Sequence, residues 1–288
     1  TVDLVLTAIL ANGHVLIEGV PGVAKTLLAR LTARLIDADF SRIQFTPDLM
    51  PSDVLGTTVF NMKTNGFDFH QGPIFADIVL VDEINRAPAK TQAALFEVME
   101  ERQISIDGTT HRMGDLYTIL ATQNPVEQEG TYKLPEAQLD RFLMKITMDY
   151  PSLEEEVNIL ERHHTNAALV KLDDITPAIT KEEVLSLRAF MNQVFVDRTL
   201  LQYIALIVQQ TRTSKAVYLG ASPRASVAML QSSKAYALLQ GRDFVTPEDI
   251  KFVAPYVLQH RLILTAEAEM EGYSPVKVTQ RLIDKVEV

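Results

Sequence analysis

The run Asp77-Ile78-Val79-Leu80-Val81-Asp82 is apolar on both of its faces and carries an acid at each end. A strand with this pattern is buried on both sides, as in the centre of a parallel sheet covered by helices. Further strand-like runs lie at residues 14–19, 40–45, 117–122 and 142–148, and helical periodicity lies at 25–38 and 90–102. The alternation of strands and helices predicts an α/β fold with a doubly wound parallel sheet.

Two short segments interrupt this alternation. Residues 58–69 predict a hairpin inserted after a helix. Residues 103–106 followed by Asp107-Gly108 predict a second hairpin, since Asp-Gly favours a type I′ turn.

Beyond Pro151 the strand signal ends and helix-opening signals follow, at residues 152–155, 180–183 and 246–249. We therefore expect a core over residues 1–165, a linker over 166–177 and an all-helical lid domain over 180–288.

The composition and net charge indicate which partners and which cellular compartment suit this chain. The 288 residues carry a formal net charge of −10 and include no cysteine. The charge disfavours nucleic acid as a partner, because proteins that follow phosphate backbones usually present a basic face. The lack of cysteine excludes disulfides and thiolate metal sites and fits a reducing compartment, so we expect a cytoplasmic protein. No apolar run reaches the roughly 20 residues of a membrane span, and the first residues lack the signal-peptide pattern.

A glycine-containing turn follows the first predicted strand and opens the next helix. Its sequence from Gly19 to Thr26 is GVPGVAKT, which matches a phosphate-binding loop in the required strand–turn–helix context. Backbone N–H groups from Gly22 onward would surround a phosphate, Lys25 would neutralise phosphate charge, and the Thr26 hydroxyl would ligate Mg²⁺. Ala24 stands where glycine is usual, which costs little if its φ is negative, as expected at a helix start. The candidate nucleotide-binding residues are Gly19, Pro21, Gly22, Val23, Ala24, Lys25, Thr26 and Leu27.

Two carboxylates, Asp82 and Glu83, end the buried run at residues 77–82. In an open α/β sheet, ligands bind at the carboxyl ends of the strands. Asp82 would hold Mg²⁺ directly or through water, and Glu83 would act as the general base toward an attacking water. A solvated acidic turn is the alternative, which the spacing from the glycine-containing turn disfavours.

Three further polar residues are candidates for the chemistry. Asn124 follows the next buried strand and could orient the water, although an Asx-Pro turn with Pro125 is an alternative. Arg141 lies where a helix enters a strand, and could act on a neighbouring subunit or pair with Asp140 or Glu136. Arg224 lies in the first turn of a helix that Ser222 and Pro223 open. A cation there opposes the helix dipole, which favours a nearby anion over a solvated arginine.

Several longer strings carry a resemblance to a known family. They are EGVPGVAKT at residues 18–26, RIQFTPDLMPSD at 42–53, GPIF at 72–75, DEINRAP at 82–88, ATQNP at 121–125 and GTYKLPEAQLDRF at 130–142. Together they resemble the AAA+ ATPases and, more narrowly, the MoxR family of the helix-2-insert clade. The resemblance covers nearly the whole chain, and the strings QFTPD and EAQLDRF are its most specific parts.

The resemblance implies a P-loop NTPase core followed by a helical lid, with ATP and Mg²⁺ as cofactors. Asn124 matches the sensor 1 position, Arg141 the arginine finger and Arg224 the sensor 2 arginine. The two predicted hairpins match the helix-2 insert and the pre-sensor-1 insert. Ala24 is a variant that such proteins carry, and Lys133 stands where proline is common. MoxR-like proteins form homo-oligomeric rings, commonly hexamers, and act as chaperone-like factors on client proteins, often ones with a von Willebrand factor A domain.

Two rival functions remain at this point. One is a magnesium-chelatase-like or DNA-acting motor subunit, whose DNA-acting form the net charge disfavours. The other is a nucleotide-gated binding module that turns over slowly, which Glu83 disfavours because a switch that does not hydrolyse needs no base.

Overall fold

The computed structural model describes residues 1–124, 132–164 and 172–286. The chain folds into two compact units, each formed from several segments. The helical unit comprises Thr1–Leu16, Leu134–Ile146 and Leu185–Val288, and the sheet unit comprises Ile17–Lys133 and Thr147–Val184. The expected boundary between residues 165 and 180 stays a prediction.

A parallel five-stranded sheet with the order β2-β5-β8-β1-β9 is the centre of the fold. The strands are β1 (Val15–Gly19), β2 (Phe40–Gln44), β5 (Ile78–Asp82), β8 (Thr118–Gln123) and β9 (Met144–Met148). All five residues of β5 are buried, because β5 lies between β2 and β8 with helices over both faces. The predicted α/β class and doubly wound sheet are confirmed.

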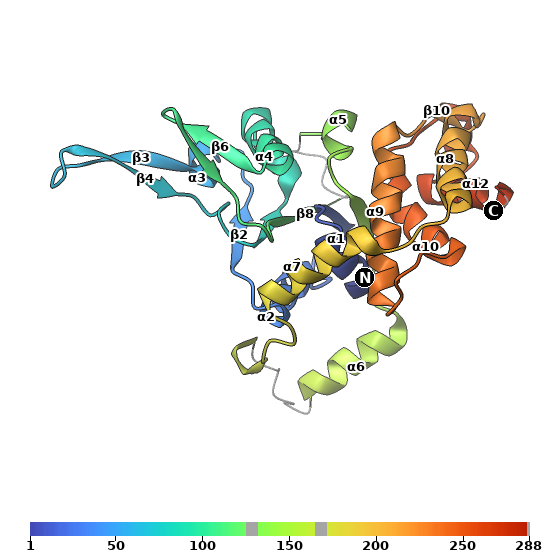
Figure 1. Cartoon of the computed structure of the whole chain (residues 1–288), viewed down its shortest axis with the longest axis horizontal. Helices are drawn as coiled ribbons and strands as arrows, with labels where there is room; N and C mark the ends of the chain where they lie inside the picture. The colour runs from blue at the N-terminus through green and yellow to red at the C-terminus, as the bar shows by residue number, and fades with distance from the viewer. Residues whose placement is uncertain (125–131, 165–171, 287–288) are drawn as a thin grey trace. The chain divides into compact units, whose positions relative to one another are not determined.

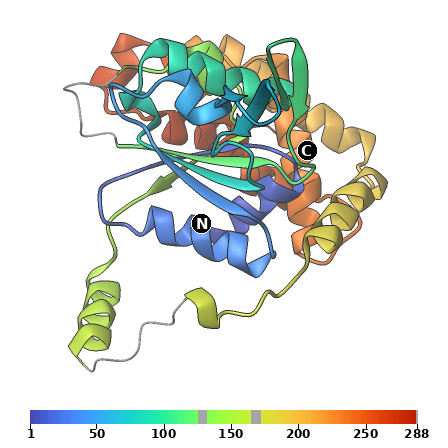
Figure 2. The same cartoon turned by 90° about the vertical axis from the view of Figure 1, so that its left-hand side faces the viewer.

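Two helices of the sheet unit cover opposite faces of this sheet. They are α2 (Lys25–Leu35) on one face and α4 (Ala89–Glu101) on the other (Figure 2). Because helices cover both faces of the sheet, the residues of β5 are buried on either face. This explains why β5 is apolar throughout and does not alternate between apolar and polar residues. The remaining elements of this unit are α3 (Pro51–Leu55), η1 (Ile84–Arg86), α6 (Leu153–His164) and η2 (Leu172–Asp174).

Both predicted hairpins are present in the sheet unit. The longer pairs β3 (Gly56–Asn61) with β4 (Gly66–Gln71) and projects away from the sheet (Figure 1). Gly56 joins α3 to β3 with φ 103°, and a Cβ there would lie 2.2 Å from the carbonyl oxygen of His70, so only glycine fits. The shorter pairs β6 (Gln103–Ile106) with β7 (Thr109–Arg112), and its turn residues Asp107 and Gly108 both have positive φ, as a type I′ turn requires.

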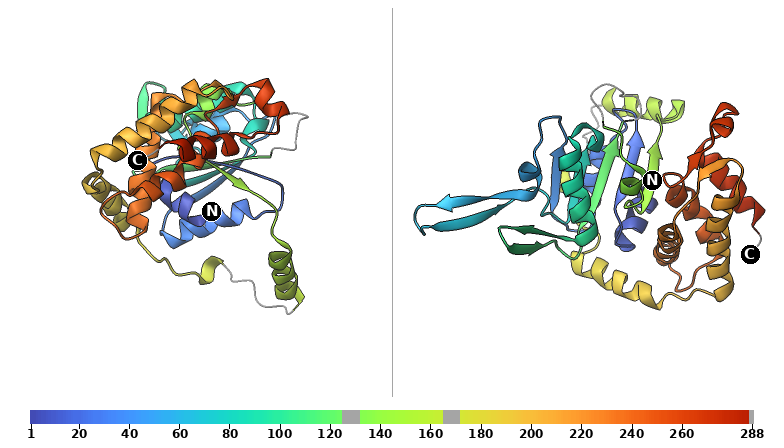
Figure 3. Two further views of the ribbon diagram at one scale, coloured as in Figure 1. Left: turned by 90° about the vertical axis from the view of Figure 1, so that its right-hand side faces the viewer. Right: turned by 90° about the horizontal axis from the view of Figure 1, so that it is seen from above.

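The helical unit is built from packed helices (Figure 3). Its elements are α1 (Val2–Leu10), α5 (Glu136–Leu139), η3 (Met191–Gln193), α8 (Arg198–Thr213), α9 (Pro223–Leu239), α10 (Pro247–Leu258), α11 (Ala266–Met270) and α12 (Pro275–Lys285), and α7 (Lys181–Phe190) precedes η3 in the chain. The sequence did not predict the short antiparallel pair of β10 (Val217–Leu219) with β11 (Ile263–Leu264). These strands of two and three residues are too short to show an alternating pattern.

The predicted helix starts are confirmed by their hydrogen bonds. The Ser152 amide donates to Glu155, the Thr180 amide to Glu183, and the Thr246 amide to Asp249. Within the described residues, no helix is long and apolar enough to cross a membrane.

Candidate functional site

The carboxyl ends of the central strands bring most of the predicted site residues to one edge of the sheet unit. The loop 20–24 leaves β1, Asp82 ends β5 with Glu83 directly after it, and Asn124 follows β8. These strands are neighbours in the order β5-β8-β1, and their parallel direction places all of these residues at the same edge. Asn124 is buried, with 7% of its surface exposed.

The loop between β1 and α2 is a tight turn whose backbone runs through two left-handed residues. Gly22 has φ 88° and Ala24 has φ 59°. The expectation of a negative φ at Ala24 is therefore wrong. The turn must enter α2 from a left-handed residue, which is why glycine is usual there, and alanine in this conformation is strained by roughly 1–2 kcal/mol.

The first turn of α2 carries the predicted cation and hydroxyl. Lys25 Nζ donates to the carbonyl oxygen of Gly19 at 2.7 Å, so the ammonium group folds back over the loop. A Cβ at Gly19 would lie 2.6 Å from the carbonyl oxygen of Met148, so the close approach of this strand to Met148 requires glycine. Thr26 is half-buried and Leu27 is exposed.

The two carboxylates at the end of β5 have several polar partners that sequence reasoning did not assign. Asp82 Oδ2 accepts from Arg42 Nε at 2.6 Å, and its Oδ1 accepts from Thr122 Oγ1 at 3.0 Å. Thr122 Oγ1 in turn accepts from the amide of Glu83, also at 3.0 Å. Because Thr122 is buried, its hydroxyl connects both carboxylate residues through one rigid strand, β8.

The Glu83 side chain is held by two donors on the same oxygen. Gln44 Nε2 donates to Glu83 Oε2 at 2.8 Å, and Arg86 Nε lies 3.1 Å from that oxygen. Glu83 itself has a left-handed backbone, with φ 56°. Arg42 and Gln44 lie two residues apart on β2 and therefore point to the same face of the sheet. This spacing of polar residues on a strand is the sequence signal that could have identified them as partners of the two carboxylates.

A pocket of about 460 Å³ adjoins the loop within the sheet unit. Its lining residues come from the loop, from the segment after β9 and from the start of α6. The lining includes Gly22, Val23, Ala24, Tyr150, Glu155 and Asn158. The pocket is thus next to the predicted phosphate loop and has both an aromatic ring and polar groups.

Arg141 and Arg224 belong to the helical unit. Arg141 follows α5, and Arg224 is the second residue of α9. Ser222 occupies the N-cap position of α9 as predicted, but its hydroxyl does not cap the helix and donates to Asp140 Oδ2 at 3.0 Å. Asp140 also forms a 2.7 Å ion pair with Arg261, which lies 121 residues away in sequence and was not a candidate.

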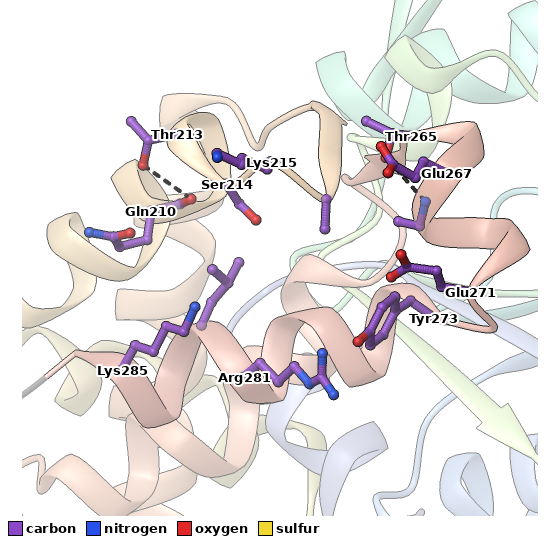
Figure 4. A pocket seen from close by; sticks show the side chains of 13 residues that line it. Gln210, Thr213, Ser214, Lys215, Thr265, Glu267, Glu271, Tyr273, Arg281 and Lys285 are labelled. Atoms are coloured by element: carbon purple, nitrogen blue, oxygen red, sulfur yellow. Dashed lines mark hydrogen bonds between the residues drawn. The ribbon is translucent and has the colours of Figure 1, made fainter.

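A second pocket, of about 550 Å³, lies in the helical unit between the end of α8 and α12 (Figure 4). The guanidinium of Arg281 lies over the Tyr273 ring at 4.3 Å, and acidic and basic side chains share the walls. None of the predicted site residues lines it.

The fold and the sheet edge define a P-loop ATPase of the AAA+ class. Residues 14–144 match the family model described as "ATPase family associated with various cellular activities (AAA)", and residues 209–284 match the AAA lid domain. A solved structure of a putative ATPase from Cytophaga hutchinsonii superimposes with a TM-score of 0.90 at 42% identity, over 99% of this chain and 88% of that one.

Within that class the chain belongs to the MoxR family. It is 44% identical to the chaperone MoxR1 of Mycobacterium tuberculosis, over 99% of this chain and 77% of the relative. It is 30% identical to the protein MoxR of Methylorubrum extorquens, over 93% of this chain and 84% of that protein. It is also 48% identical to the protein YeaC of Bacillus subtilis, over 99% of this chain and 88% of the relative.

Proposed function

We propose that this chain binds Mg·ATP at the carboxyl edge of its sheet and hydrolyses it between neighbouring subunits of a ring. The observation that carries the proposal is the meeting of three features at one sheet edge. They are the left-handed loop after β1, the paired carboxylates after β5 and the amide of Asn124 after β8. Membership of an ATPase family supports the same reaction.

The loop suits an anionic triphosphate. Amides at the start of a helix, combined with the helix dipole, favour phosphate oxygens, and Lys25 adds a full positive charge beside them. In this proposal the Lys25 ammonium group exchanges the Gly19 carbonyl for phosphate oxygens. The neighbouring pocket of about 460 Å³ suits the nucleoside, with Tyr150 available for stacking and Glu155 and Asn158 for hydrogen bonds.

The donor set fits Mg²⁺. Asp82 supplies carboxylate oxygens and Thr26 a hydroxyl, and hard oxygen ligands of this kind are those that Mg²⁺ prefers. Each Asp82 oxygen already accepts one hydrogen bond and retains a further lone pair for the ion or its water. Bound Mg²⁺ would neutralise phosphate charge.

Glu83 has the role of general base in the proposal. Its carboxylate would accept a proton from the attacking water, with the Asn124 amide orienting that water. Gln44 and Arg86 hold one carboxylate oxygen, so the other is the one available to the water. Arg141 of a neighbouring subunit would stabilise the charge on the transferred phosphate, and Arg224 would have the role of the sensor 2 arginine that the resemblance implies.

Client remodelling is the biological use that we propose for the hydrolysis. The β3–β4 hairpin exposes Val59, Phe60, Met62 and Phe67, with Met62 89% exposed. A projecting apolar surface of this kind is a common feature of protein-binding sites. The family resemblance further supports a hexameric ring and a client with a von Willebrand factor A domain. The chaperone name of the MoxR1 relative supports action on client proteins.

The test is ATP turnover by the wild type, Glu83→Gln and Lys25→Ala, with Glu97→Gln on the exposed face of α4 as the matched control. We expect Glu83→Gln to bind ATP but to hydrolyse it at least ~100-fold more slowly, the usual contribution of a general base. Lys25→Ala should lose ATP binding in calorimetry, and Glu97→Gln should behave as the wild type. Turnover by Glu83→Gln equal to the wild type would contradict the proposal, and a wild type that binds ATP without hydrolysing it would favour a nucleotide-gated switch.

A further inference from the structure

The Arg261 side chain, three residues after the end of α10, is only 2% exposed and uses all of its hydrogen-bond donors. A guanidinium has five N–H groups. Nε donates to Asp140 Oδ1 at 2.7 Å, and the terminal nitrogens donate to the carbonyls of Asp140, Phe142, Leu143 and Val257. Four of the five bonds therefore end on residues 140–143.

These four bonds surround Arg141. The Asp140 carbonyl, in the peptide group before Arg141, lies 3.2 Å from Nη2, and the Phe142 carbonyl, in the second peptide group after Arg141, lies 2.7 Å from the same nitrogen. The peptide group between Arg141 and Phe142 is held separately, by the amide of Phe142, which donates to the carbonyl of Leu139 at 3.1 Å. Fixing the peptide groups on both sides of a residue fixes the direction of its Cα–Cβ bond. Together with the Phe142 amide, the guanidinium of Arg261 thereby sets the direction in which the Arg141 side chain leaves the backbone, and the proposed function assigns that side chain to a neighbouring active site.

Other contacts hold the same segment. Gln259 Nε2 donates to the carbonyl of Lys145 at 2.5 Å, and His260 Nε2 lies 3.1 Å from the carbonyl of Phe142. The second oxygen of Asp140 accepts the hydroxyl of Ser222, two residues before Arg224. One carboxylate thus connects the Arg141 segment both to the end of α10 and to the start of α9.

We propose that Arg261 is a positioning residue for ATP hydrolysis, which holds the backbone around Arg141 so that Arg141 reaches the nucleotide of the adjacent subunit in a fixed orientation. The inference rests on the proposed function, since it presupposes that Arg141 acts on a neighbouring nucleotide. Asp140 is the anionic partner that aligns the guanidinium.

The discriminating variant is Arg261→Lys, which keeps the positive charge but has three donors from a single nitrogen and cannot bond four acceptors spread along a chain segment. The matched control is Arg242→Lys in the same unit. The Arg242 guanidinium pairs with Asp249 at 2.5 Å and donates to the carbonyl of Phe244, both close to it in sequence. Both variants lose a planar arginine from an ion pair, and only Arg261→Lys removes bonds to the segment around Arg141.

We expect Arg261→Lys to lower kcat for ATP at least ~10-fold with KM changed less than ~2-fold, because small misplacements of a catalytic group cost up to ~100-fold. Arg242→Lys should keep kcat within ~2-fold of the wild type. Hydrogen exchange followed by mass spectrometry should show faster exchange over residues 139–145 in Arg261→Lys alone. If Arg261→Lys does not fold, Asp140→Asn removes the same ion pair and should give the same two results.

Mixed rings separate this inference from the proposed function. Arg141→Ala mixed with Lys25→Ala should recover activity, because the latter subunits donate an intact Arg141, and Arg261→Lys mixed with Lys25→Ala should recover it likewise. Recovery by the first mixture without recovery by the second would overturn the inference alone. Unchanged kcat and exchange in Arg261→Lys would also overturn it. Wild-type turnover by Arg141→Ala would instead remove the trans-acting arginine from the proposed function, and this inference with it.

Discussion

Acid should destabilise the helical unit through His260. This residue follows α10, is buried, and lies with Nε2 3.1 Å from the carbonyl oxygen of Phe142. Burial lowers the pKa of His260 well below its ordinary value, and the positive charges of Arg261 and Lys145 lower it further. Because a carbonyl only accepts, the neutral ring must carry its proton on Nε2.

The size of the effect follows from the difference between the pKa of His260 in the folded state and its pKa in the unfolded state. An unfolded histidine has a pKa of about 6.5, whereas the folded one stays neutral at lower pH. Below about pH 6.5 the unfolded state therefore binds one more proton, so stability falls as pH falls. For one histidine this amounts to about 1 kcal/mol between pH 7 and pH 5.5.

The assay is urea unfolding at pH 7 and pH 5.5 for the wild type and His260→Gln. Glutamine can donate to the Phe142 carbonyl but does not titrate, so His260→Gln should lose about 1 kcal/mol less on acidification than the wild type. His70→Gln, at an exposed position of β4, should follow the wild type. Equal acid sensitivity of the wild type and His260→Gln would refute the reasoning.

Two further predictions concern the sheet edge. Ala24→Gly should stabilise the protein by about 0.5–1 kcal/mol in urea unfolding, because glycine relieves the left-handed strain at φ 59° and offsets part of that gain by its greater freedom when unfolded. The same substitution at Ala93, exposed inside α4, should instead cost about 1 kcal/mol, and equal signs at the two positions would contradict the argument. Thr122→Val should cost about 1–3 kcal/mol and lower ATP turnover, because Asp82 Oδ1 loses its donor and the Glu83 amide its acceptor. Thr122→Ser keeps the hydroxyl and should stay close to the wild type in both assays, so that identical losses in the two variants would exclude this role of the hydroxyl.

Local sequence determined the elements and the residues at their ends. The doubly apolar run of β5 could only be a central strand, and the Asp107-Gly108 pair could only favour one kind of turn. Because parallel strands end at one edge, the same pattern also predicted that the loop after β1 and the carboxylates after β5 would meet there. These conclusions depend on periodicity and turn chemistry, which are properties of a few consecutive residues.

Tertiary structure decided the partners of those residues. The Arg261 contacts to residues 140–143, the Gln44 contact to Glu83 and the Arg42 contact to Asp82 join residues far apart in the chain. The left-handed backbone of Ala24 is set by how the turn must join β1 to α2, against the preference of alanine itself. A side chain's local pattern reveals which element it occupies, whereas its hydrogen-bond partner depends on which distant element packs against it, and only the folded chain specifies that.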